Sequence, residues 1–182
     1  MYNSPLKIPV SESDHHLGSL RAPLVLVEYG DFECSYSSSA APEMERLVAE
    51  YSSHLCFVYR QFPMRKIHPH ATLAAVAAEA ADLQNQFWSM HHLLFQNYDI
   101  LSVETVLALA ESLELDMAQF REDLQRDDLA DRIEHDFDGG LASGVHGTPT
   151  FFLNNQRLEI PATFDFFKDI FDDLRSSEPP EV

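Results

Sequence analysis

The sequence has few cysteines, few basic residues and no long apolar run. Its 182 residues include two cysteines, Cys34 and Cys56, which are too few for a disulfide framework and favour a reducing compartment. No stretch approaches the ~20 apolar residues that a membrane-spanning helix needs, so we expect no membrane insertion. The N-terminal residues lack the apolar core of a secretory signal. We therefore expect a cytoplasmic protein, unless a signal was removed before this numbering begins.

Acidic residues outnumber basic ones, 30 to 12, and give a formal net charge of −18. Such a surface repels phosphate backbones and anionic lipids, so we expect no nucleic-acid partner. The composition is otherwise globular, with 45% hydrophobic and 11% aromatic residues. The length suits one domain, which we expect over residues 23–175, with a surface arm at 1–22, a helical insertion at about 65–140 and a disordered tail at 176–182.

The hydrophobic pattern predicts an α/β protein. Residues 24–30 (LVLVEYG) indicate a buried strand, 35–51 a helix that Pro42 kinks or breaks, and 54–62 a second strand. Strand, helix and strand in this order favour a β-α-β unit with parallel strands. The further elements expected are helices over 68–84, 86–97, 103–115 and 117–144 (the last broken at Gly139-Gly140), a strand within 147–155 and a helix over 163–174.

The motif C-S-Y-S at residues 34–37 is the first candidate site. Cys34 stands where the first strand passes into a helix, and a helix N-terminus stabilises a thiolate through its dipole and its unpaired N–H groups. Ser37 is placed to donate a hydrogen bond to that sulfur. Asp31 and Glu33 act in the opposite direction, because nearby negative charge disfavours a thiolate. Spacing alone leaves a reactive thiol and a small buried cysteine equally open.

Other residues carry weaker signals. Glu28 interrupts an apolar strand; if it is buried, its pKa should rise and it could exchange protons with a sulfur, whereas the alternative is that its side of the strand faces water. Pro149 precedes an apolar strand, and an ordinary trans bond is the default there. Cys56 should be a core residue. The nine histidines lack metal-ligand spacing, so we expect no metal. No phosphate-binding loop is present in the sequence, and we expect no bound cofactor.

Together, these segments resemble the DsbA-like thioredoxin-fold family, in its cytosolic-type branch of thiol-disulfide oxidoreductases. APLVLVEYGDFECSYS (22–37) resembles the stretch that carries the C-P-Y-C motif of the family, and SDHHLG (13–18) matches the cytosolic-type branch. The match continues through FVYRQFPM (57–64), HPHATLAAVAAEAADLQNQFWSMHHLLF (68–95) and GVHGTPTFFLNN (144–155), and it covers about residues 13 to 174.

The resemblance implies a thioredoxin fold, a central mixed sheet flanked by helices with a helical insertion. It also implies that Cys34 is the nucleophile, that Thr148-Pro149 is a cis peptide facing the sulfur, and that Glu28 lies beneath the site. The residues expected to contact a partner are Ser35, Tyr36, His146, Thr148 and Pro149. The motif departs from the family where Ser35 replaces the proline and Ser37 the second cysteine, so the internal disulfide of the family cannot form.

Three functions remain open, and we rank them in this order. The first is monothiol exchange, in which Cys34 forms mixed disulfides with protein or with glutathione and an external thiol such as glutathione releases it. The second is a non-catalytic binding module that keeps a groove beside Pro149. The third is a glutathione-dependent isomerase or transferase similar to the kappa class, with Ser35 or Ser37 activating glutathione. The sequence sets no oligomeric state.

Overall fold

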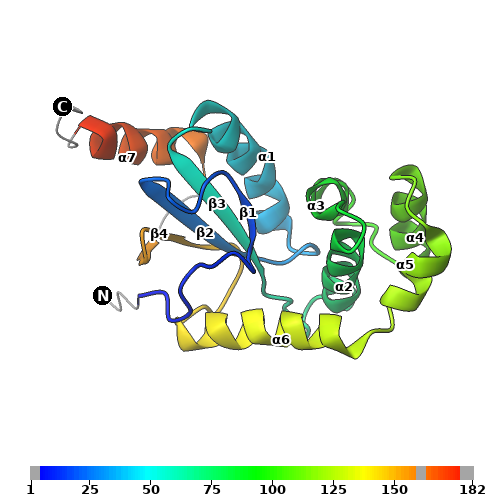
Figure 1. Cartoon of the computed structure of the whole chain (residues 1–182). Coiled ribbons are helices and arrows are strands. Elements are labelled where there is room, and N and C mark those ends of the chain that lie inside the picture. Colours follow the sequence, from blue (N-terminus) through cyan, green and yellow to red (C-terminus); the bar gives the residue numbers. More distant parts are fainter. Residues whose placement is uncertain (1–4, 159–162, 177–182) are drawn as a thin grey trace.

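Five strands form one mixed sheet at the centre of the fold (Figure 1). The computed structural model describes residues 5–158 and 163–176. In spatial order the strands are β1 (His15–Leu17), β3 (Leu55–Gln61), β2 (Leu24–Gly30), β4 (Thr150–Leu153) and β5 (Gln156–Leu158). β2 and β3 are parallel, and the other neighbouring pairs are antiparallel. The predicted mixed α/β sheet is therefore confirmed.

The parallel pair β2 and β3 is connected by helix α1 (Ser35–Glu50), which confirms the expected β-α-β unit. Both strands are rich in β-branched and aromatic residues and are almost entirely buried, as parallel strands covered on both faces must be. α1 continues through Pro42, so the alternative of a break there is wrong. Ala41 and Met44, on either side of Pro42, are buried in one core, and their packing outweighs the lost helical hydrogen bond.

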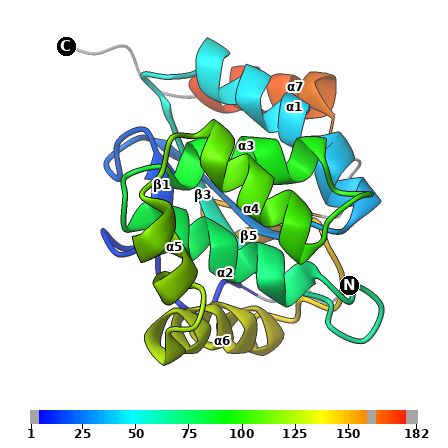
Figure 2. The ribbon, with the colours of Figure 1, turned by 90° about the vertical axis from the view of Figure 1, so that its right-hand side faces the viewer.

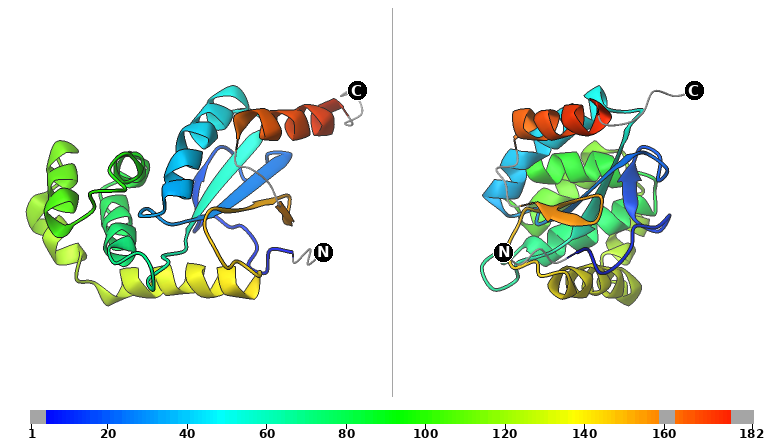
Figure 3. Two further views of the ribbon diagram at one scale, coloured as in Figure 1. Left: turned by 180° about the vertical axis from the view of Figure 1, so that it is seen from behind. Right: turned by 90° about the vertical axis from the view of Figure 1, so that its left-hand side faces the viewer.

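Helices cover both faces of the sheet, and Figure 3 shows α1 and α7 (Phe164–Ser176) on the side opposite α6 (Asp127–Ala142). Alternate residues of the strands supply the two cores. Leu26 of β2 packs in the core that includes α1 and α7, whereas Val27 packs in the core that Phe137 of α6 contacts. The Cys34 turn thus joins a strand and a helix that are both fixed by buried packing.

The insertion between β3 and β4 is helical, as predicted. Its helices are α2 (Ala71–Asp82), α3 (Phe87–Gln96), α4 (Val103–Ser112), α5 (Met117–Asp123) and α6. α4 and α5 lie on the outer side of α2 and α3 (Figure 2). The helix expected over 117–144 is two helices, separated at residues 124–126, and α6 passes through both glycines at which the break was expected.

Gly139 and Gly140 allow α6 to approach the sheet closely. A Cβ atom on Gly140 would lie 2.7 Å from Cδ2 of Phe62, and one on Gly139 would lie 2.9 Å from Cγ1 of Ile8. Both distances are shorter than normal contacts, so a side chain at either position would force its neighbours to shift. The glycine pair therefore marks a packing contact inside the helix, which explains why the predicted break was misplaced.

The edge strands β1 and β5 were not expected, because both lie in polar segments. β1 pairs with β3, with His15 opposite Tyr59, so part of the expected N-terminal arm belongs to the sheet.

α7 ends at Ser176, the first residue of the expected tail, and 177–182 lie outside the described residues. Among the helices that the structure describes, none combines the length and apolar character needed to cross a bilayer.

Candidate active site

Cys34 lies in the turn between β2 and α1, where it is the N-cap residue of α1. Its N–H donates to the Asp31 carbonyl oxygen at 3.0 Å, and its own carbonyl accepts from the Ser38 N–H at 2.9 Å. The residue is 5% exposed, and its thiol donates to the Thr148 carbonyl oxygen at 3.3 Å. The sulfur is therefore held between the start of a helix and the loop before β4.

The loop before β4 brings Thr148 and Pro149 to the sulfur. The Thr148-Pro149 peptide bond is cis, and both residues are half-buried. β4 pairs antiparallel with β2, with Thr150 opposite Tyr29. Because β2 leads into the Cys34 turn and β4 begins beside the end of β2, this pairing places the two loops together.

The N-terminus of α1, next to the sulfur, is not capped by a side chain. Cys34 makes no side-chain capping hydrogen bond, and the first turn of α1 contains no acidic residue. The unpaired N–H groups and the dipole of the helix stabilise negative charge at this end. In contrast, the hydrogen bond to the Thr148 carbonyl stabilises the neutral thiol. Formation of the thiolate is therefore coupled to loss of the Thr148 contact.

The two acids that precede the cysteine are held by histidines, an arrangement that the sequence analysis missed. The Asp31 carboxylate accepts from the Met64 N–H at 2.7 Å and lies 2.8 Å from Nδ1 of His68. The Glu33 carboxylate accepts from the His70 N–H at 2.6 Å and lies 3.0 Å from Nδ1 of His70. These hydrogen bonds hold both carboxylates in fixed positions beside the turn. The available signal was the HPH sequence at 68–70.

Ser37 is fully buried, with 0% exposure. Its hydroxyl accepts a long hydrogen bond, 3.5 Å, from the Asp31 N–H. The expected hydrogen bond from this hydroxyl to the sulfur of Cys34 is not among those that the described residues make. Ser37 therefore contacts the backbone of the turn and not the sulfur.

Glu28 lies on β2, six residues before Cys34, and is 1% exposed. The alternative that it faces water is therefore wrong. Burial raises the pKa of Glu28 from 4.5 to about 8, so the carboxyl group is protonated at neutral pH. Its Oε1 has no hydrogen-bond partner among the described residues. A neutral acid at this position is a candidate proton donor for chemistry at the end of β2.

The other residues expected to contact a partner are exposed and lie near Cys34 or Thr148 in the chain. Tyr36, in the first turn of α1, is 76% exposed, and Ser35 beside it is also exposed. His146 is exposed on the loop that carries Thr148. These three residues are thus accessible at the surface, whereas Cys34 itself is buried.

Cys56 is separate from this site. It lies opposite Val25 in the middle of the sheet, is 0% exposed, and belongs to the core on the α6 side. Burial, and secondarily the charge of Asp14, raises the pKa of Cys56 to about 11. Both cysteines are free thiols. The prediction of a core cysteine is thus confirmed, and a buried thiol of this kind cannot attack a disulfide on Cys34.

Metal chemistry finds no support in the part of the chain that the structure describes. Within residues 5–158 and 163–176, no group of three or more His, Cys, Asp and Glu side chains is arranged to hold a metal ion. Two histidines instead pair with the acids beside the cysteine.

Comparisons with known proteins agree with this geometry. A family model described as Thioredoxin matches residues 10–173. The chain is 44% identical over 157 residues to Na(+)/H(+) antiporter NhaA 3 of Salinispora tropica, a match covering 86% of this chain and 24% of that protein. The chain spans about a quarter of the length of the curated relatives it matches.

Solved structures share the fold. A thioredoxin-like oxidoreductase from Silicibacter pomeroyi DSS-3 has a TM-score of 0.78 at 24% identity, covering 92% of this chain and 95% of that chain. Wolbachia pipientis alpha-DsbA1 has a TM-score of 0.80 at 18% identity, covering 94% of both chains. With a family match over residues 10–173 and this shared architecture, the chain belongs to the thioredoxin family and has the DsbA-like form of its fold.

Proposed function

We propose that the protein carries out thiol-disulfide exchange through the single sulfur of Cys34. The observation that carries the proposal is the position of this sulfur. It lies at an uncapped helix N-terminus and contacts the carbonyl oxygen that precedes a cis proline. A helix N-terminus favours a thiolate, and the half-buried cis-proline loop beside it offers backbone groups to a partner chain.

The reaction has two exchange steps. The Cys34 thiolate attacks one sulfur of a protein or glutathione disulfide; a new S–S bond forms at Cys34, the old S–S bond breaks, and the departing thiolate takes a proton from solvent. An external thiolate then attacks the partner sulfur of the mixed disulfide, and Cys34 leaves as a thiolate. Cys34 ends the cycle in the state in which it began, and the disulfide has moved to the external thiol.

The reaction needs an external thiol, because neither Ser37 nor Cys56 can release a partner from Cys34. Ser37 has no sulfur, and Cys56 is buried in the middle of the sheet. We propose glutathione as this external thiol. Because glutathione keeps cytosolic thiols reduced, we also propose that the reaction takes place in a reducing, cytoplasmic compartment. Deglutathionylation and disulfide isomerisation are the reactions that this chemistry supports.

Partner binding is proposed to use the loop and the aromatic residue beside the sulfur. The Thr148 carbonyl oxygen accepts from the Cys34 thiol in the free protein. When Cys34 forms a mixed disulfide, the thiol proton is gone and this carbonyl becomes available to an N–H of the partner chain. Tyr36 is exposed enough to pack on the partner.

A non-catalytic binding module is the second candidate. The observation in its favour is that Cys34 is 5% exposed and donates to a carbonyl oxygen, because burial limits the access of a partner disulfide to the sulfur. Under this alternative, partner segments would bind beside Pro149 without turnover.

A turnover assay separates the two candidates. A glutathionylated peptide is mixed with the protein and reduced glutathione, and release of the peptide thiol is measured for wild type, Cys34→Ser and Cys56→Ala. We expect Cys34→Ser to abolish the catalysed rate and Cys56→Ala to retain it. No acceleration by the wild type, together with peptide binding that survives Cys34→Ser, would instead establish the binding module.

A further inference from the structure

Tyr59 on β3 carries a buried hydroxyl group with no hydrogen-bond partner among the described residues, and its side chain is 1% exposed. Tyr29 on β2 is equally buried, but its hydroxyl accepts from Nη1 of Arg60 at 3.0 Å. Buried hydroxyl groups are nearly always hydrogen-bonded, and exceptions call for an explanation such as a catalytic role. The hydroxyl group of Tyr59 therefore calls for an explanation, whereas the hydrogen-bonded hydroxyl group of Tyr29 does not.

The position of Tyr59 points toward the candidate active site. Tyr59 is paired with Glu28 across the parallel strands, so both side chains lie on one face of the sheet. A Cβ on Gly30 would lie 2.4 Å from Cε2 of Tyr59 and 2.8 Å from its hydroxyl oxygen. The ring thus extends from Glu28 to a point two residues further along β2, toward the turn that carries Cys34. Gly30, which has no side chain, makes room for it.

The charges around Tyr59 agree with this placement. Burial raises the pKa of Tyr59 well above its usual value, and negative charges on Glu28, Asp31 and Cys34 raise it further. The phenol therefore keeps its proton throughout the functional pH range and acts as a hydrogen-bond donor. Glu28 and Cys34 both lie within electrostatic reach of that donor.

We propose that Tyr59 is a positioning residue that couples Glu28 to Cys34, because its hydroxyl donates to whichever of the two carries the negative charge. This inference rests on the proposed exchange at Cys34. When Cys34 becomes or leaves as a thiolate, the hydroxyl turns to the sulfur. When Glu28 loses its proton, the hydroxyl turns to the carboxylate and the thiolate loses a donor. The two ionisations therefore oppose each other.

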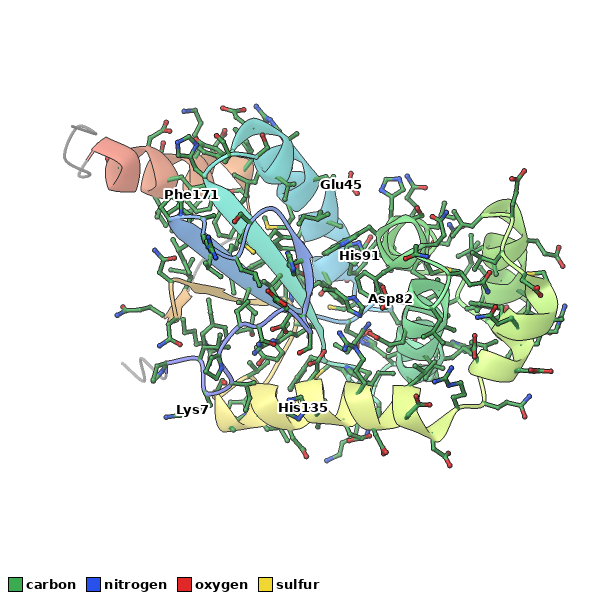
Figure 4. All side chains as sticks on the ribbon, viewed as in Figure 1. Lys7, Glu45, Asp82, His91, His135 and Phe171 are labelled. Carbon is green, nitrogen blue, oxygen red and sulfur yellow. The ribbon has the colours of Figure 1, made fainter. Side chains whose placement is uncertain are left out.

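Other titratable groups face Tyr59 and do not take over this role. The His91 ring of α3 lies 4.6 Å from the Tyr59 ring at 88°, and Figure 4 shows His91 between α3 and the sheet. Burial lowers the pKa of His91 to about 3, so the ring is neutral. Burial raises the pKa of Asp136 to about 6, and its carboxylate accepts from the Gln61 N–H at 3.0 Å. The Asp31 carboxylate is occupied by Met64 and His68.

The test is the rate at which iodoacetamide alkylates Cys34, measured by peptide mass spectrometry from about pH 7 to about pH 10, where Asp136 is already ionised. Wild type is compared with Tyr59→Phe, Glu28→Gln and the double variant. Tyr29→Phe is the matched control, because it removes a buried hydroxyl from the other face of the sheet. Tyr59→Phe keeps the ring that packs on Phe32, and urea unfolding checks that the fold is retained.

We expect Tyr59→Phe to raise the midpoint of the alkylation profile by about one pH unit, since a hydrogen bond to a charged group is lost. Glu28→Gln should lower the midpoint when Tyr59 is present and leave it unchanged in the Tyr59→Phe background. Tyr29→Phe should leave the midpoint unchanged. A Tyr59→Phe midpoint equal to that of wild type, or equal effects of Glu28→Gln in both backgrounds, would overturn the inference while leaving the exchange function intact. A wild-type thiol that stays unreactive throughout the range would instead remove the proposed function itself.

Discussion

Replacing Glu28 by glutamine should stabilise the fold more as the pH rises. Glu28 is 1% exposed, and burial raises its pKa from 4.5 to about 8. Below pH 4.5 both the folded and the unfolded chain hold the proton, so the carboxyl group adds no pH dependence there. Between 4.5 and about 8 only the folded chain keeps the proton; unfolding then releases it, and stability falls as the pH rises.

The magnitude follows from the size of the shift. Each pH unit corresponds to ~1.4 kcal/mol. The carboxyl group therefore lowers the free energy of unfolding by about 3 kcal/mol at pH 7 and by about 5 kcal/mol above pH 8. Glutamine has nearly the same shape but does not ionise. Glu28→Gln should accordingly match wild type near pH 4.5 and exceed it increasingly at higher pH.

Urea unfolding at about pH 5, 7 and 8.5 measures this difference. Glu122→Gln is the matched control, because Glu122 is exposed on α5, and it should give a small difference that does not grow with pH. A Glu28→Gln difference that stays constant across the three pH values would refute the reasoning, since it would mean that the folded and unfolded chains bind this proton alike.

Two further predictions concern the turn and α6. Ser37→Cys should create a dithiol that oxidises to a disulfide, because it restores the Cys-X-X-Cys spacing of redox motifs at a helix N-terminus. Thiol titration before and after oxidation should show the loss of two thiols, and retention of both would contradict the prediction. Gly140→Ala should destabilise the fold by about 1–3 kcal/mol in urea, because the added Cβ would lie 2.7 Å from Phe62, whereas Gly147→Ala, with no atom within 4 Å of its Cβ, should have little effect.

The sequence predicts those parts of the fold in which the local pattern and the tertiary packing agree. The apolar run of β2, the helical spacing of α1 and the second apolar run of β3 each match the structure. The pattern fails where distant contacts decide. Gly139 and Gly140 resemble a helix end until Phe62 and Ile8 are known to pack on them. β1 forms because His15 pairs with β3. The polar sequence of this segment gives no indication of that pairing.

In the candidate site, too, the local features can be predicted from the sequence and the contacts between distant residues cannot. A cysteine between a strand and a helix is visible in the sequence, as is the proline before β4. The histidine partners of the two acids cannot be seen in the sequence, because His68 lies 37 residues from Asp31 and His70 lies 37 residues from Glu33. The orientation of Ser37 is equally hidden, since its hydroxyl faces the Asp31 N–H. A side-chain direction set by the local turn geometry cannot be derived from a spacing of three residues.

The most direct test of the account is to trap the mixed disulfide itself. The folded protein is incubated with oxidised glutathione near neutral pH, quenched with acid, and mapped by peptide mass spectrometry before and after addition of reduced glutathione. We predict one glutathione adduct, on Cys34, with Cys56 unmodified because it is 0% exposed, and complete release by the added thiol. The absence of an adduct on Cys34 in the folded protein, or an adduct that reduced glutathione does not release, would contradict the claim that this single sulfur carries out thiol-disulfide exchange.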